Sequence, residues 1–208
     1  MALIVSMSTH HKSIKHLSKD KYLGKFVRGY GPLRFRREHA LEPFQALCES
    51  IIYQQISGSA AASILKKFVA LWPLKKFPTP EDVLKIKIEK LHTAGVSPQK
   101  AAYLKDLAAK FKDGTINPKL FPNMSDTEII EHVVAVKGIG EWTAQMFLMF
   151  TLGRPDVLPT GDLGIQKAMQ KLFALRTKPS PEKMQKLAKA WEGHRTVACF
   201  YLWRTLDN

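Results

Sequence analysis

Val136-Lys137-Gly138-Ile139-Gly140 is the stretch of this sequence that decides its fold. It stands between two segments whose apolar residues recur at helical spacing, one over about 125–136 and one over about 141–152. Two glycines permit a tight turn with positive φ, and such a turn presents backbone N–H groups to an anion at the start of the second helix. We expect Ile139 to anchor the turn in the core and Lys137 to add positive charge at its mouth. The alternative is an ordinary turn between helices.

Charge is the strongest feature of the composition. The 208 residues include 32 Lys and Arg against 18 Asp and Glu, a formal net charge of +14. A polyanion is the expected partner of so basic a protein, with nucleic acid first and an anionic membrane surface second. The alternative is a basic protein that meets no polyanion.

Membrane insertion and secretion are not expected from the sequence. No apolar run approaches the roughly 20 residues that span a bilayer. Residues 1–7 are mildly apolar but precede a lysine-rich stretch, the reverse of a secretory signal. The two cysteines, Cys48 and Cys199, lie far apart and cannot supply four thiolates for an iron–sulfur cluster or an all-cysteine zinc site. We expect both to be core residues in a reducing compartment.

The rest of the chain also has a mostly helical pattern. Apolar residues at helical spacing run over 41–71 and are interrupted at 55–59, where we expect a turn. Capping signals predict helix starts after Thr79, Ser97 and Ser125, and two further helices are expected over about 162–174 and 181–206. Strand signals are weak, so we predict an all-α fold.

Residues 136–144 resemble the hairpin of the helix-hairpin-helix DNA glycosylases of the Gly/Pro-Asp type. The resemblance continues into the Gly/Pro-rich loop Leu158-Pro159-Thr160-Gly161-Asp162-Leu163-Gly164. It also includes residues 50–62 and 191–203, and covers most of the chain from about residue 41. The spacing from hairpin to aspartate is similar to that of the alkylpurine branch, the 3-methyladenine DNA glycosylase II type.

This resemblance implies a two-lobed helical bundle that forms one glycosylase unit over 1–208. The approximate lobes are 41–155, which holds the hairpin 136–140, and 1–40 together with 156–208. It implies a monofunctional glycosylase that flips alkylated purines (3-methyladenine, 7-methylguanine) out of duplex DNA, hydrolyses their N-glycosidic bond and leaves an abasic site for base excision repair.

The expected partner is damaged double-stranded DNA, with the protein as a monomer and no membrane. The protein would be cytoplasmic and nucleoid-associated in a bacterium, or nuclear in a eukaryote. Two alternatives stay open: a non-catalytic helix-hairpin-helix protein that only binds DNA, and a glycosylase of the same fold for etheno or deaminated bases.

Asp162 is the candidate catalytic residue. Cleavage of a glycosidic bond leaves positive charge on the sugar, which a neighbouring carboxylate stabilises. The local sequence alone favours a helix N-cap, and it is the spacing from the hairpin required by the resemblance that favours catalysis. The two roles are compatible because the cap would fix the carboxylate. The other acid of this loop, Asp156, does not match the family position, and we expect it to bond locally in a turn.

The base pocket is expected to include Trp142, Trp203, Tyr53, Met146 and Leu163. Trp142 stands where bifunctional relatives carry the lysine of the lyase reaction, so no strand cleavage is expected, and its ring can stack on a cationic base. The alternatives are helix packing for Trp142, a C-terminal core helix for Trp203, and the core for Tyr53. Met146 and Leu163 replace aromatic residues of the alkylpurine branch, so the range of bases stays open.

DNA is expected to contact the hairpin and a wedge loop. The hairpin residues are Lys137, Gly138, Ile139, Gly140 and Thr143, and the wedge that fills the gap left by a flipped base is Gln55, Ile56, Ser57 and Gly58. Ile56 is the apolar candidate for insertion, although Gln54 and Gln55 could instead cap backbone groups.

Basic residues including Lys100, Lys105 and Arg195 could contact phosphates, although most lysines are expected on solvated helix faces. The histidines show no metal-ligand spacing. We therefore expect no metal site and no cofactor. The resemblance alone implies a monovalent cation at the hairpin.

Overall fold

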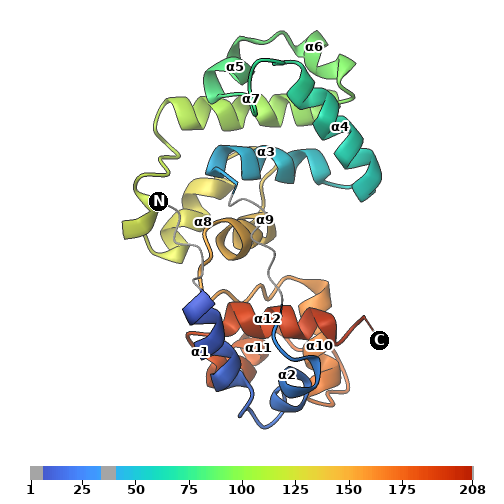
Figure 1. Cartoon of the computed structure of the whole chain (residues 1–208), viewed down its shortest axis with the longest axis vertical. Helices are drawn as coiled ribbons and strands as arrows, with labels where there is room; N and C mark the ends of the chain where they lie inside the picture. The colour runs from blue at the N-terminus through green and yellow to red at the C-terminus, as the bar shows by residue number, and fades with distance from the viewer. Residues whose placement is uncertain (1–6, 34–40, 208) are drawn as a thin grey trace. The chain divides into compact units, whose positions relative to one another are not determined.

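The computed structural model describes residues 7–33 and 41–207, and every regular element within them is helical (Figure 1). The predicted all-α class is confirmed. The chain divides into two compact units, which we treat separately. Unit 1 comprises residues 7–33 and 148–207 of the described chain, and unit 2 comprises 41–147. None of the helices in the described ranges is long and apolar enough to cross a membrane.

Unit 2 is built around the longest of its helices, α7. Figure 1 shows α7 between α3 and α5, and it packs against both. Leu47 and Ile51 of α3 and Leu104 and Leu107 of α7 are fully buried, so the helical spacing of the apolar residues produces the packed face. The helices of this unit are α3 Pro43–Tyr53, α4 Gly58–Ala70, α5 Pro80–Lys85, α6 Ile88–Thr93, α7 Pro98–Lys112, α8 Asp126–Val134 and α9 Glu141–Met146, with a 3-10 turn Phe121–Asn123.

The helix starts that the sequence predicts are confirmed by the capping geometry. Thr79 and Ser125 each form a capping box, with Asp82 and Glu128 respectively. The hydroxyl of Ser97 accepts a hydrogen bond from the backbone of the first turn of α7. Caps of this kind contribute on the order of 1 kcal/mol each. They fix where α5, α7 and α8 begin.

Unit 1 combines both ends of the chain. Its helices are α1 Met7–Leu17, α2 Gly24–Tyr30, α10 Leu163–Leu172, α11 Pro181–Leu187 and α12 Arg195–Arg204, with a 3-10 turn Ala188–Trp191. Helix α10 packs on α12, and α1 packs on α12 as well. Hydrogen bonds between Ser13 Oγ and His194 Nδ1 (2.9 Å) and between His16 Nε2 and the carbonyl of Ala190 (2.8 Å) fasten α1 to the C-terminal segment.

Two predicted helices are interrupted in the structure. The single helix expected over 181–206 is wrong, because the chain turns at Gly193, whose φ of +78° lies in the left-handed region. The helix expected over 141–152 continues as α9 only to Met146 and then becomes a π-helical segment, Phe147–Thr151. Such π-helical turns often occur at functional sites.

Candidate functional site

The hairpin turn is shaped by the packing of Gly138 on an aromatic ring. Gly138 has φ +81°, and a Cβ atom there would lie 2.2 Å from ring carbons of Tyr103. The turn is further held by the Lys137 backbone N–H, which donates to Asp106 Oδ2 at 2.8 Å. Ile139 is buried, as expected for the anchor of the turn. Position 138 therefore requires glycine for the fold of unit 2 itself.

Gly140 differs from Gly138 both in its backbone conformation and in the space around its Cα atom. Its φ is −97° and its ψ 174°, so the positive φ that we expected of the hairpin lies at Gly138 alone. A Cβ atom at position 140 would meet nothing within 4 Å. Gly140 is the N-cap of α9 and makes no side-chain cap, while Lys137 beside it is exposed and Thr143 is half-buried. The fold of unit 2 therefore does not require glycine at position 140. Because glycine has no side chain, the start of α9 is left uncovered.

The predicted wedge loop is tied to the hairpin within unit 2. Gln54 Nε2 donates to the carbonyl of Gly138 at 2.9 Å, so this glutamine bonds to the hairpin backbone. Lys100 Nζ donates to the carbonyls of Ile52 and Gln54 at 2.7 and 2.8 Å. Burial lowers the pKa of Lys100. Lys100 thus closes the end of α3, which argues against the phosphate contact that we considered for it.

The tip of this loop is exposed and strained. Gln55 has φ +57°, an uncommon conformation for a residue with a side chain. Ile56 is 39 % exposed, and Gly58 begins α4. Ser57 caps α4 by accepting from the Ala60 backbone N–H. Strain at an exposed tip is found at functional sites more often than elsewhere.

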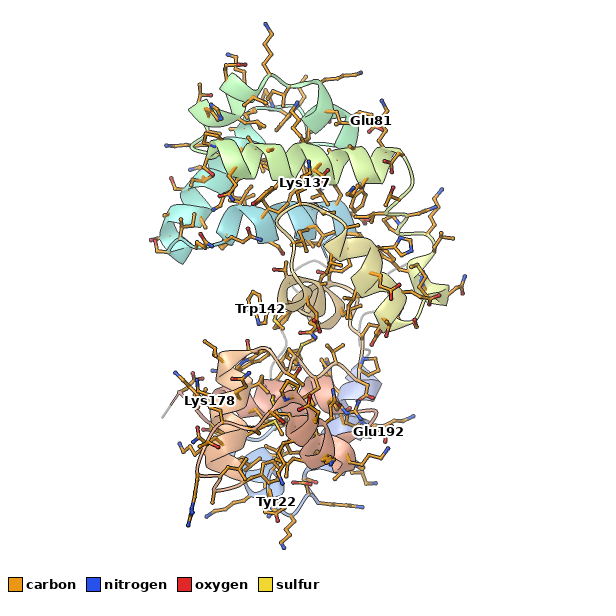
Figure 2. All side chains as sticks on the ribbon, turned by 180° about the vertical axis from the view of Figure 1, so that it is seen from behind. Tyr22, Glu81, Lys137, Trp142, Lys178 and Glu192 are labelled. Carbon is orange, nitrogen blue, oxygen red and sulfur yellow. The ribbon has the colours of Figure 1, made fainter. Side chains whose placement is uncertain are left out.

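Two aromatic pocket candidates project from unit 2. Trp142 is 51 % exposed, and Figure 2 shows its side chain extending away from α9. Tyr53 is 41 % exposed, so it does not belong to the core of unit 2, which was the alternative. Met146 is half-buried in the last turn of α9.

Asp162 is held by two donors on one oxygen. Its Oδ1 accepts from the backbone N–H of Ile165 at 2.7 Å, which makes Asp162 the N-cap of α10. The same Oδ1 accepts from the indole Nε1 of Trp203 at 3.0 Å. Asp162 and Trp203 are both half-buried, whereas Leu163 is 60 % exposed. The carboxylate is therefore fixed at a helix N-terminus with apolar surface beside it.

Asp156 has a different role from the one expected. Its Oδ1 accepts from the backbone N–H of Arg195 at 3.3 Å, and its Oδ2 lies 3.4 Å from Arg195 Nη1. The prediction of a local turn bond is wrong, because the partner is 39 residues away. The side chain of Arg195 is paired with this carboxylate and is only 17 % exposed. Both observations argue against the phosphate contact that we considered for Arg195.

The family model that matches this chain is described as the HhH-GPD superfamily of base excision DNA repair proteins. The match covers residues 48–193, which include the hairpin and Asp162. This chain belongs to the HhH-GPD superfamily.

Curated relatives within the HhH-GPD superfamily have glycosylase names. The chain is 33 % identical to the alkylbase DNA glycosidase-like protein mag2 of Schizosaccharomyces pombe, over 95 % of this chain and 94 % of that protein. It is 34 % identical to DNA-3-methyladenine glycosylase 1 of the same organism, over 89 % of this chain and 81 % of that protein. It spans only 63 % and 57 % of the length of two Bacillus subtilis relatives.

A solved structure shares the fold. The 3-methyladenine DNA glycosylase Mag1 of Schizosaccharomyces pombe, in complex with abasic DNA, superposes with a TM-score of 0.81 and 32 % identity. The superposition covers 95 % of this chain and 97 % of that one. A protein similar to this chain over nearly its whole length is thus seen on DNA.

Two aromatic residues beside Trp203 were missed by the sequence analysis. Phe150 is 61 % exposed, and its ring stacks on that of Trp203 at 6.1 Å between centroids and 18° between planes. The ring of Phe200 contacts both of these rings, with 5.3 Å between its centroid and that of Phe150 and 5.9 Å between its centroid and that of Trp203. Residues 147–150 belong to the apolar helix that the sequence predicts over 141–152, and the π-helical segment that exposes Phe150 has no recognisable sequence signal.

The prediction for Lys105, a phosphate contact or a place on a solvated helix face, is also wrong. Its Nζ donates to the carbonyls of Leu84 and Ile86, and burial lowers its pKa. This lysine closes the end of α5, so its charge is used inside unit 2.

Proposed function

We propose that this chain is a monofunctional DNA glycosylase that hydrolyses the N-glycosidic bond of alkylated purines, such as 3-methyladenine and 7-methylguanine, in duplex DNA. Membership of the HhH-GPD superfamily and the 3-methyladenine glycosylase names of its relatives support this proposal. The observation that carries it is the geometry of Asp162, a carboxylate that two donors fix at the start of α10 in the loop where the family has its aspartate.

The chemistry that we assign to Asp162 is stabilisation of charge on the sugar. The bond between C1′ and the purine nitrogen breaks with its electron pair going to the base, so a cationic alkylpurine leaves as a neutral molecule. The sugar then carries positive charge, and a water adds to C1′ and loses a proton to bulk water. A carboxylate about 4 Å from this charge at an effective dielectric near 20 contributes roughly 4 kcal/mol. That corresponds to about a thousandfold in rate.

The absence of lyase activity is the second part of the proposal. Schiff-base formation needs a nucleophilic amine at the anomeric carbon. Trp142 occupies the position where bifunctional relatives carry that lysine, and an indole cannot form a Schiff base. Its exposed ring instead offers a face on which an electron-poor base stacks. The product would be an intact strand with an abasic site.

Two of the DNA contacts are assigned to unit 2. The open N-terminus of α9 at Gly140 and the charge of Lys137 are suited to a backbone phosphate. The exposed Ile56, at the tip of a loop that Gln54 fastens to the hairpin, is the wedge candidate for the space left by a flipped base. Such contacts position the duplex without reading its sequence.

We further propose that residues 1–208 act as one glycosylase unit and as a monomer. It would work wherever the DNA lies, in the nucleoid of a bacterium or the nucleus of a eukaryote. The proposed reaction needs water and no organic cofactor, and a monovalent cation at the hairpin stays a prediction.

The test is base release from a methylated duplex by the wild type and by Asp162→Asn, followed by separate alkali treatment to reveal abasic sites. We expect the wild type to release methylated purines, with strand breaks only after alkali, and Asp162→Asn to bind DNA but release no base. Asp207→Asn, an exposed carboxylate in the same unit, is the matched control. Release only from etheno or deaminated duplexes would change the substrate class. Binding without release from any duplex would leave a non-catalytic DNA-binding protein, and full activity of Asp162→Asn would disprove the assignment.

A further inference from the structure

The hydrogen bond between Trp203 and Asp162 joins two helices of unit 1. Asp162 caps α10, Trp203 lies in the last turn of α12, and the two helices pack on each other. The indole N–H and the Ile165 backbone N–H both donate to Oδ1, one from α12 and one from α10. With one oxygen held by two donors, the carboxylate cannot rotate without breaking at least one bond.

The indole is itself held in place. Phe150 stacks on it, and Phe200 contacts it at 5.9 Å between centroids and 34° between planes. An aromatic side chain with two aromatic neighbours and one hydrogen bond has little freedom to turn. The direction of its N–H is thereby fixed by packing within unit 1.

Gly164 leaves room for this contact. A Cβ atom at position 164 would lie 3.0 Å from Asp162 Oδ1, 3.0 Å from Trp203 Cδ1 and 3.1 Å from Trp203 Nε1. These separations are tighter than a Cβ normally tolerates, so any side chain there would press on both partners of the hydrogen bond. We call Asp162, Gly164 and Trp203 the carboxylate clamp.

We infer that Trp203 is a positioning residue for Asp162, acting through its indole N–H. The inference rests on the proposed role of Asp162. Within the clamp, Asp162 stabilises the charge on the sugar and Trp203 holds the carboxylate of Asp162 in position. A donor already in place before the reaction holds the carboxylate where charge develops on the sugar, so no reorganisation is needed at that moment. Trp203 then does not only line the base pocket, because its indole N–H orients the carboxylate that the reaction requires.

Two substitutions at position 203 separate the N–H from the bulk of the ring. Trp203→Phe keeps an aromatic ring and loses the donor. Trp203→His loses the six-membered ring but keeps a five-membered ring whose Nε2 occupies the place of the indole Nε1. The measurements are the single-turnover rate of base release from methylated duplex at pH 8, where imidazole is neutral, and the dissociation constant for the same duplex.

We expect Trp203→Phe to lower the rate about tenfold or more with little change in DNA binding, since a hydrogen bond to a charged group is removed. Trp203→His should recover a substantial part of the rate. The reverse order, with Trp203→Phe near wild type and Trp203→His impaired, would assign the residue to stacking and overturn the inference. So would weaker DNA binding at an unchanged rate.

Gly164→Ala provides a test that leaves Trp203 intact. We expect it to slow base release severalfold without weakening DNA binding, because the carboxylate and the indole must move apart by a few tenths of an ångström. Alanine is a better helix former than glycine, so unfolding would not account for the slower release. The control is Gly29→Ala in α2, where a Cβ atom meets nothing within 4 Å. A wild-type rate for Gly164→Ala would contradict the clamp.

Asp162→Asn distinguishes failure of this inference from failure of the proposed function. If Asp162→Asn releases base normally, the proposed function is wrong and the clamp has no role in it. If Asp162→Asn is inactive while Trp203→Phe and Gly164→Ala act at the wild-type rate, Asp162 keeps its role and the inference alone fails.

Discussion

The two glycines of the hairpin should respond differently to the same substitution. Gly138→Val places a Cβ 2.2 Å from Tyr103 ring carbons and forces a β-branched residue to φ +81°. The left-handed conformation costs about 1–2 kcal/mol and overpacking about 1–3 kcal/mol. We expect the free energy of unfolding to fall by roughly 2–5 kcal/mol, with the melting temperature falling about 2–4 °C per kcal/mol in a chain of this size.

Gly140→Val should leave the fold nearly unchanged and weaken DNA binding. Its backbone is extended and the added Cβ meets no atom of the protein within 4 Å, so the expected loss of stability is at most about 1 kcal/mol from a poorer N-cap. The side chain would block a phosphate from the start of α9. A hydrogen bond to a charged group contributes about 1.5–3 kcal/mol, so the dissociation constant should rise about tenfold to a hundredfold.

The assay combines thermal unfolding with fluorescence anisotropy on two undamaged duplexes of unrelated sequence at one salt concentration. The affinity for both duplexes should fall by the same factor with Gly140→Val, because a phosphate contact carries no sequence information. Wild-type affinity of Gly140→Val would remove the hairpin from the DNA interface. Weaker binding confined to one duplex would replace phosphate contact with base recognition.

Three further predictions concern pH, salt and thiol chemistry. Burial, then the neighbouring His16, lower the pKa of His194 against the opposing pull of Asp156. The unfolded chain thus takes up that proton first, and stability should fall as the pH drops below about 6.5. Thermal unfolding of His194→Gln should show a weaker dependence, and an unchanged slope would refute this. Unit 1 has 19 Lys and Arg against 7 Asp and Glu in residues 1–40 and 148–208, net +12, whereas residues 41–147 have 13 against 11, net +2. Replacing the exposed lysines in and just after α1 by glutamine should reduce the slope of log K against log salt by up to about 0.9 for each phosphate that the variant no longer neutralises, and an equal slope would exclude this segment from the interface. The lysines concerned are Lys12, Lys15 and Lys19. Burial raises the pKa of both thiols, Cys48 and Cys199, so a thiol reagent should modify them only after unfolding, and rapid reaction of the native protein would contradict their burial.

The sequence predicted those parts of the fold that depend on local signals. Ser125 and Thr79 were identified as caps because the hydroxyl, the acid three residues later and the helix that follows are all local. The break at Gly193 was missed because a glycine inside a long apolar pattern is compatible with a continuous helix. The π-helical exposure of Phe150 was missed because it depends on how the chain leaves α9.

The site was predicted as a set of positions rather than as a set of contacts. Asp162 was identified through its spacing from the hairpin, and its role as N-cap is confirmed. Its bond to Trp203, 41 residues away, could not be inferred because it depends on how α10 packs against α12. Asp156 was misjudged for the same reason, since its partner Arg195 is distant in sequence.

The N-terminal ends of α9 and α10 suggest how one structural feature can serve two purposes. A helix N-terminus has unpaired backbone N–H groups and favours negative charge. Gly140 at the start of α9 brings no side chain that could accept from such groups, whereas Asp162 at the start of α10 brings a carboxylate. The carboxylate that accepts from the N–H of Ile165 is thereby fixed in position, as it must be to stabilise a cationic sugar. Exchanging the two N-cap residues should therefore abolish both DNA binding at α9 and base release. Gly140→Asp would repel a backbone phosphate, and Asp162→Gly would leave the start of α10 open to an anion that cannot assist the reaction.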